Sequence, residues 1–139
     1  MNKAIARCWP WLYVIDFIIH SIFRIIIPSR FGKVILCDRY LPDAIVELIC
    51  ETSDEHFLEK LPAKILTALI PKPSAIYVID LDELTAYKRK ADIPSIEYLR
   101  KRRKLYLKVA LWLNAYILDG ERKPYELHKD IMNLLSFER

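Results

Sequence analysis

The chain has 139 residues, of which 53% are hydrophobic and 29% charged, and its formal net charge is +4. This length fits one domain with a single core, and the apolar content excludes an intrinsically disordered protein. The three cysteines have no metal-ligand spacing, so neither a disulfide framework nor a zinc site is supported. We therefore expect one domain over residues 1–139, with reduced thiols, in the cytoplasm.

Glycine and charge distribution narrow the possible functions. Only Gly32 and Gly120 occur, so no G-x-x-x-x-G-K-[ST] or G-x-G-x-x-G phosphate-binding loop can be written within these 139 residues. Between residues 84 and 108, nine Lys and Arg stand against only Asp92 and Glu97. This local excess of positive charge favours an anion site or a solvated helix face over a general nucleic-acid surface.

The first predicted element is an apolar helix over residues 9–27. Its ionisable residues Asp16, His20 and Arg24 recur at every fourth position and form one polar stripe on a helix. A central Asp or Arg costs about 2.5–3.5 kcal/mol in a membrane, so we expect no stable membrane insertion. We expect a helix buried in a globular core, with a helix in a membrane interface as the alternative. The stripe either lines a ligand cleft or forms a solvent-exposed ladder, and its spacing favours the ladder.

Three continuous apolar runs predict strands buried on both faces, over residues 34–37, 75–79 and 115–118. Each run ends on an aspartate: Asp38, Asp80 and Asp119. Helices are predicted over residues 58–70, 82–90, about 95–114 and 126–135. Residues 41–59 are mixed, with Pro42 as a local breaker and Ser53 or Asp54 as candidate helix caps.

This order of elements predicts an α/β fold with a short parallel sheet of about three strands flanked by helices. Ligands of such sheets bind beyond the carboxyl ends of the strands. The long helix over residues 95–114 places Arg103 on the same line as the apolar Leu99 and Tyr106. An inward-facing guanidinium needs an anion, because an unpaired buried charge is unfavourable.

Four segments resemble, in order, the thymidylate-kinase-like P-loop nucleoside monophosphate kinases: VILCDRY, PKPSAIYVIDLDELTAYKRK, EYLRKRRKLYLKVA and AYILDGERKPYELHKDI. The resemblance covers nearly the whole chain. It implies an incomplete three-layer α/β/α fold of the P-loop kinase type. It also implies ATP-dependent phosphoryl transfer to a nucleotide, usually dTMP, with Mg²⁺ as cofactor; such chemistry consists mostly of positioning and charge neutralisation.

The resemblance also implies site residues. Asp38 matches the aspartate near Mg²⁺ and the transferring phosphate, and Arg39 matches the arginine that holds the acceptor phosphate. The alternative for this pair is a salt bridge at the end of a strand. Four basic residues match the lid over the phosphates and the arginine on the helix after it: Lys88, Arg89, Lys90 and Arg103.

Two further regions are assigned through the resemblance. Asp119 and Gly120 match the turn near which the family places adenine. The acceptor pocket has four candidates: Asp16, His20, Arg24 and Tyr40. After Tyr40 the chain reads Leu41-Pro42-Asp43-Ala44, where typical dTMP kinases carry small and amide residues, so the acceptor stays open.

The chain begins where the third helix of the family begins. We therefore expect the C-terminal portion of a nucleotide kinase, inactive alone because no loop cradles the β- and γ-phosphates. The expected partners are a nucleotide and either a separate N-terminal polypeptide carrying that loop or a second copy of the chain. The alternatives are a non-catalytic nucleotide-binding or regulatory module, and a membrane or nucleic-acid contact through the basic segment.

Overall fold

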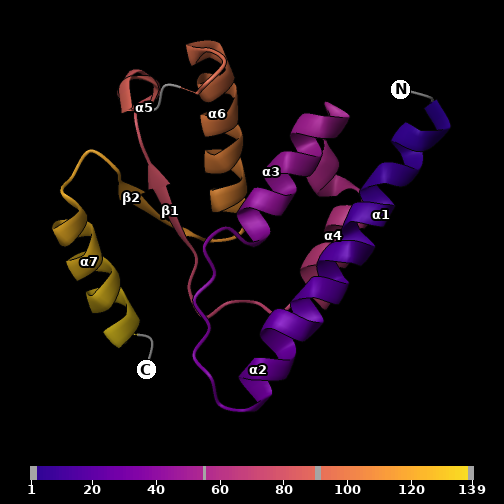
Figure 1. Ribbon diagram of the computed structural model, residues 1–139, viewed down its shortest axis with the longest axis horizontal. Helices are drawn as coiled ribbons and strands as arrows, with labels where there is room; N and C mark the ends of the chain where they lie inside the picture. The colour runs from indigo at the N-terminus through magenta and orange to yellow at the C-terminus, as the bar shows by residue number, and fades with distance from the viewer. Residues whose placement is uncertain (1–2, 55, 90–91, 138–139) are drawn as a thin grey trace. The chain divides into compact units, whose positions relative to one another are not determined.

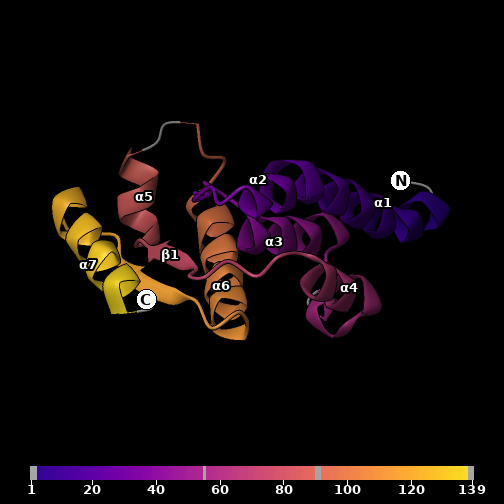
Figure 2. The ribbon, with the colours of Figure 1, turned by 90° about the horizontal axis from the view of Figure 1, so that it is seen from below.

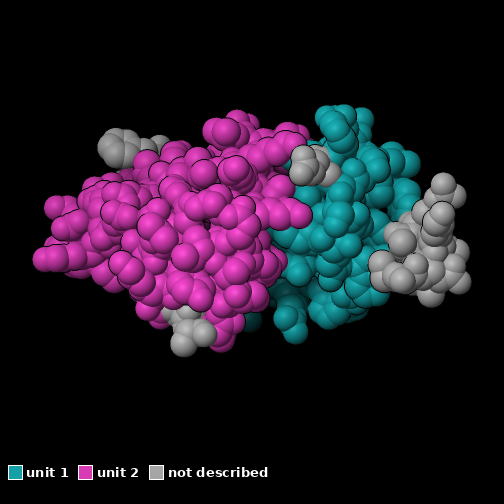
Figure 3. Space-filling view, turned by 90° about the horizontal axis from the view of Figure 1, so that it is seen from above, with its two compact units in different colours: residues 1–72 teal, residues 73–139 magenta. Residues whose placement is uncertain are grey.

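The computed structural model describes residues 3–54, 56–89 and 92–137 (Figure 1). The chain divides into two compact units, residues 1–72 and residues 73–139 (Figure 3). A compact unit is not by itself a folding domain. The single domain expected over residues 1–139 therefore stays a prediction.

In its described residues, unit 1 contains only helices. Its elements are α1 (Lys3–Ser21), the π-helix η1 (Ile22–Ile26), α2 (Ile27–Arg30), α3 (Leu41–Thr52), the 3₁₀ helix η2 (Phe57–Glu59) and α4 (Leu61–Leu69). Figures 1 and 2 show α1, η1 and α2 as one rod, with α3 and α4 beside α1.

Helix α3 supplies most of the core of unit 1. Five of its buried residues follow the spacing of one helical face: Leu41, Ala44, Ile45, Leu48 and Ile49. Pro42 and Val46 are buried as well. The interpretation of Pro42 as a breaker was wrong, because proline in a first turn lacks only an N–H that has no helical partner. Neither Ser53 nor Asp54 caps α4; Ser53 instead ends α3 in a left-handed conformation.

Helix α1 is less buried than expected. Val14 and Ser21 are buried, whereas Leu12, Ile19 and Phe23 on the rod are exposed. Within the described residues, the stretch Cys8–Arg30 is the one helix long and apolar enough to cross a membrane, judged by length and composition. Core helices and signal sequences have the same properties, so this stretch does not decide between the alternatives.

The predicted strand over residues 34–37 is not formed. These residues have no regular secondary structure, and the side chains of Val34 and Leu36 are 97% exposed. A strand needs a neighbour to take its backbone hydrogen bonds. No described residue provides such a neighbour here, and the three-stranded sheet stays unconfirmed.

Unit 2 is mixed α/β, as predicted. Its elements are β1 (Tyr77–Asp80), α5 (Glu83–Arg89), α6 (Ile96–Trp112), β2 (Tyr116–Asp119) and α7 (Pro124–Phe137). The two strands pair in parallel, with Tyr77 opposite Tyr116 and Asp80 opposite Asp119. In Figures 1 and 2, α6 and α7 lie on opposite sides of this strand pair.

The core of unit 2 lies where α6 packs on the strands. Leu105, Val109 and Ala110 are the buried residues of α6, together with Val78 of β1 and Leu127 of α7. Leu99 and Tyr106 of the predicted apolar line are half-buried, and Leu105 was not predicted on that line. The rings of Tyr77 and Tyr116 stack across the strand pair, with centroids 5.5 Å apart.

Candidate functional site

The carboxyl ends of β1 and β2 meet at one edge of the sheet. The backbone N–H of Gly120 donates to the carbonyl oxygen of Asp80 over 2.6 Å. A Cβ at Gly120 would lie 2.8 Å from that oxygen and 2.9 Å from Cγ2 of Ile79. Glycine is therefore required for the two backbones to approach so closely.

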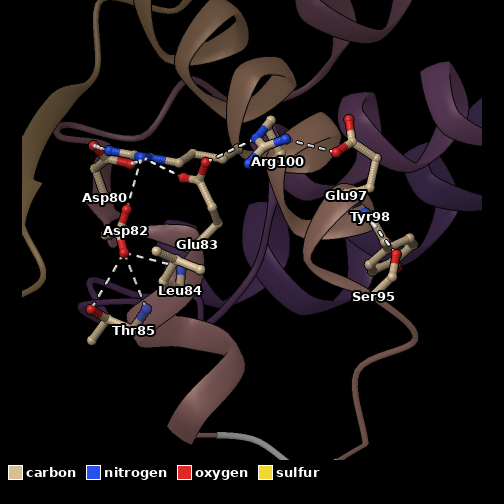
Figure 4. Close-up of polar contacts among 10 residues, drawn as sticks. Asp80, Asp82, Glu83, Leu84, Thr85, Ser95, Glu97, Tyr98 and Arg100 are labelled. Carbon is tan, nitrogen blue, oxygen red and sulfur yellow. Dashed lines mark hydrogen bonds and ion pairs between the residues drawn. The ribbon is translucent and has the colours of Figure 1, made fainter.

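Arg103 of α6 reaches this edge and hydrogen-bonds to the carboxylates of Asp80 and Glu83, and its Nη1 lies 3.9 Å from Oδ1 of Asp82. Figure 4 labels these three carboxylates. Its Nε and Nη2 donate to the two oxygens of Asp80 over 2.6 and 2.8 Å, and its Nη1 donates to Glu83 over 2.7 Å. The anion expected for this guanidinium is therefore supplied by Asp80 and Glu83. Hydrogen bonds from Arg103 lower the pKa of Asp80, and these carboxylates raise the pKa of Arg103.

Glu83 connects α5 to two arginines of α6. Besides the bond from Arg103, it accepts a 3.1 Å hydrogen bond from Nε of Arg100, whose Nη1 donates to Glu97 over 2.8 Å (Figure 4). A hydrogen bond from its own backbone, followed by those from Arg103 and Arg100, lowers the pKa of Glu83 to about 2. Glu83 is therefore ionised at neutral pH.

Asp82 starts α5. Its Oδ2 accepts hydrogen bonds from the backbone N–H groups of Leu84 (3.0 Å) and Thr85 (3.2 Å). These N–H groups have no helical partner in the first turn, so the side chain of Asp82 satisfies them. This cap fixes the first turn of α5, and with it the position of Glu83.

The predicted lid residues have different surroundings. Lys88 and Arg89 are exposed at the C-terminal end of α5, and Nη1 of Arg89 donates to the carbonyl oxygen of Gly120 over 3.5 Å. Arg89 thereby joins the lid segment to the turn predicted to lie near adenine. Oδ1 of Asp119 in that turn accepts from the N–H of Glu121 over 2.9 Å. Lys90 lies outside the described residues.

The predicted catalytic pair lies in unit 1, in the connection before α3. Asp38 and Arg39 are exposed, and neither forms an ion pair with any residue that the structure describes. The alternative of a salt bridge between them is therefore not formed. Arg39 has φ of +62°, a left-handed conformation that costs about 1–2 kcal/mol for a residue with a Cβ. Such backbone strain clusters at functional sites.

The predicted acceptor residues lie on α1 and next to it. His20 Nδ1 is 3.4 Å from Oδ1 of Asp16, and both side chains are exposed. Arg24 is also exposed, and no described residue forms an ion pair with it. This geometry corresponds to the solvent-exposed ladder for Asp16 and His20.

Tyr40 differs from the other acceptor candidates because it is half-buried within unit 1. Its ring lies 5.6 Å from that of Phe17 on α1, and its hydroxyl donates to the carbonyl oxygen of Pro71 over 3.4 Å. Burial raises the pKa of Tyr40, and a hydrogen bond with Ser21 partly offsets the rise. These contacts give Tyr40 a structural role in unit 1, and its place in the acceptor pocket stays a prediction.

The donor groups for Mg²⁺ are few. Among the described residues, no three His, Cys, Asp or Glu side chains converge as a metal site. Mg²⁺ in kinases is bound by one or two carboxylates and by substrate phosphates. The resemblance assigns Asp38 as one such carboxylate, and a nucleotide would have to supply the phosphates.

Sequence reasoning placed Arg103 correctly on an inward line but missed its partners. Asp80 was noted only as the end of a strand, and no carboxylate was named as the partner of Arg103. The sequence did contain a signal for these partners, because an inward-facing guanidinium needs an anion. In the predicted topology, the nearest anions were the carboxylates at the end of the preceding strand. Whether Arg103 also contacts phosphate stays a prediction.

The known proteins found to be similar to this chain are of one kind. The chain is 27% identical over 113 residues to a probable thymidylate kinase of Pyrobaculum aerophilum, a match covering 77% of this chain and 56% of that protein. It is 27% identical over 139 residues to a probable thymidylate kinase of Methanocaldococcus jannaschii, covering 97% of this chain and 68% of that protein. No family model and no solved structure matches.

The class defined by the fold and these matches is an α/β protein with a parallel strand pair flanked by helices. Within that class, the chain has a thymidylate-kinase-like relationship, which confirms the resemblance seen in its sequence. The match spans little more than half of the first relative's length.

Proposed function

We propose that this chain is part of a thymidylate-kinase-like nucleotide kinase and binds a nucleoside monophosphate of the dTMP type. The observation that carries the proposal is the 27% identity to a probable thymidylate kinase over 97% of this chain. The exposed Asp38 and the left-handed Arg39 support it, because both side chains are available to a ligand.

The chemistry proposed is ATP-dependent phosphoryl transfer with Mg²⁺. Arg39 would hold the acceptor phosphate, since a guanidinium binds phosphate oxygens through paired charge-assisted hydrogen bonds. Asp38 would offer a carboxylate near the transferring group. The lid cations would neutralise phosphate charge in a cytoplasmic enzyme. The printed residues contain no phosphate-binding loop, so a loop would have to come from another segment or polypeptide.

Calorimetry with nucleoside monophosphates tests the binding step. We expect dTMP or a related monophosphate to bind the chain, and Arg39→Ala to weaken this binding about tenfold or more, because a charge-assisted contact is lost. Arg30→Ala is the matched control, since Arg30 is also an exposed arginine of unit 1. Equal losses in both variants, or no binding of any monophosphate, would contradict the proposed function.

A coupled kinase assay tests the phosphoryl-transfer step. We expect no turnover by the chain alone, because its 139 residues contain no glycine-rich loop to cradle the β- and γ-phosphates. Robust turnover by the purified chain would contradict this expectation. Monophosphate binding without turnover, even with a loop-bearing polypeptide added, would instead identify a non-catalytic nucleotide-binding module.

A further inference from the structure

The polar network around Arg103 has an unusual feature for a residue predicted to bind phosphate. Arg103 is predicted to serve phosphate, yet its Nε, Nη1 and Nη2 all donate to carboxylates of the chain itself. Asp80 takes two parallel bonds at the end of β1, a bidentate pairing that is strong and geometrically specific. Glu83 takes a single bond from Nη1.

The two carboxylates are not equally replaceable. Asp80 lies on a strand and is fixed by the sheet, and it holds Arg103 with two bonds. Glu83 lies on α5, a helix of only seven residues, and meets Arg103 through one nitrogen. The side chain of Arg103 is 35% exposed, so an anion from solvent can approach it. Glu83 is therefore the carboxylate that an incoming phosphate would replace.

We propose that Glu83 competes internally for Arg103: its carboxylate occupies the side of the guanidinium that a phosphate group would take. A bound polyphosphate displaces Glu83 from Arg103, and the first turn of α5 then loses this attachment to α6. The hydrogen bond from Arg100 to Glu83 remains, and Oδ1 of Asp82 stays 3.9 Å from Nη1 of Arg103. The proposal rests on the proposed function only in taking the ligand to be a phosphate.

This exchange would couple phosphate binding to the lid. Lys88 and Arg89 lie at the C-terminal end of the same short helix whose N-terminal turn carries Glu83. Release of Glu83 would loosen that helix and let its basic end adjust to the phosphate. In the structure as it stands, the same contacts keep α5 attached to α6.

The decisive variant is Glu83→Gln in the full chain, with inorganic tripolyphosphate as the probe in calorimetry at fixed ionic strength. We expect the variant to bind tripolyphosphate about tenfold more tightly than the natural sequence, because a neutral amide competes less well for the guanidinium. Glu97→Gln is the matched control: Glu97 bonds to Arg100 but not to Arg103, so its affinity should be unchanged. In the double variant Glu83→Gln/Arg103→Gln the gain should disappear.

Amide hydrogen exchange supplies a second measurement, which does not require a variant. We expect saturating tripolyphosphate to speed exchange in α5 and leave α7 unchanged. Equal or weaker binding by Glu83→Gln, an equal gain in Glu97→Gln, or unchanged exchange in α5 would each overturn the proposal. The proposed function fails separately, when no monophosphate binds through Arg39, and a tripolyphosphate gain in Glu83→Gln would survive that failure.

Discussion

At the scale of single residues, the missing side chain of Gly120 allows the edge of the sheet to form. Its backbone is bonded to Asp80, whose carboxylate in turn holds Arg103. Gly120 is therefore held both by a steric requirement and by a polar network. A large shift of the strand ends would disrupt both of them. The sequence shows the glycine but not the neighbours that require it.

Gly120→Ala should lower the free energy of unfolding by about 1–3 kcal/mol, the range for an overpacked site. The added Cβ would lie within 3 Å of the Asp80 carbonyl oxygen and of Ile79. Gly32→Asn is the control, because Gly32 has open space around it and asparagine tolerates its positive φ of 71°. Urea denaturation followed by circular dichroism gives both values, and an equal effect of the two changes would contradict this account.

Glu83 should make the stability of the chain sensitive to acid. Its pKa falls from an ordinary value of 4.5 to about 2 in the folded state. The unfolded chain therefore takes up the proton first, and the stabilisation is fully present above about pH 4.5 and is lost as the pH falls toward 2. The difference in unfolding free energy between the natural sequence and Glu83→Gln should narrow across that interval. A difference that stays constant from pH 6 to pH 2.5 would refute the prediction.

At the scale of elements, most helices and two strands were predictable from the sequence. Apolar runs ending on Asp80 and Asp119 located β1 and β2. The expected burial on both faces was wrong, because Val78 is the one buried residue of the two strands, whereas Ile79 and Ile117 are exposed. The helical period located α4, α6 and α7. Helix α3 was missed because a proline in its first turn was interpreted as a breaker, although this is the one place in a helix that accepts it.

The strand expected over residues 34–37 shows that a local sequence pattern does not specify the neighbouring strand. Its four apolar residues have the composition of a buried strand, yet strand formation depends on a hydrogen-bonding neighbour elsewhere in the chain. The site shows the same limit. Arg103 was identifiable on its helix, but its pairing with Glu83 depends on how α5 and α6 pack, which no local pattern contains.

The start of α6 depends on Ser95. Its Oγ accepts a 3.1 Å hydrogen bond from the N–H of Tyr98, which has no helical partner. Ser95→Ala should lower the free energy of unfolding by about 1 kcal/mol, whereas Ser95→Asp, which keeps a capping oxygen, should stay within about 0.5 kcal/mol of the natural sequence. Thermal denaturation of the two variants distinguishes them, and identical stabilities would show that the cap is not used.

At the scale of the whole molecule, leucine residues differ widely in solvent exposure although their side chains are chemically identical. Leu36 is 97% exposed, whereas Leu48 in α3 is fully buried. Leu48→Ala should lower the free energy of unfolding by about 2–5 kcal/mol through lost packing and a cavity. Leu36→Ala should change it by no more than about 0.5 kcal/mol. Chemical denaturation of both variants tests this, and a large loss in Leu36→Ala would mean that residues 34–37 are packed in solution.

The parallel pairing of β1 and β2 also has a kinetic consequence. A two-residue hairpin cannot join parallel strands, and here the 35 residues from 81 to 115, with α5 and α6 among them, lie between the two partners. Long loops must close before such a pair forms, and high contact order slows folding. We expect unit 1, built from neighbouring helices, to regain its structure first after dilution from denaturant. The meeting of Tyr77 with Tyr116 then sets the refolding time of the chain.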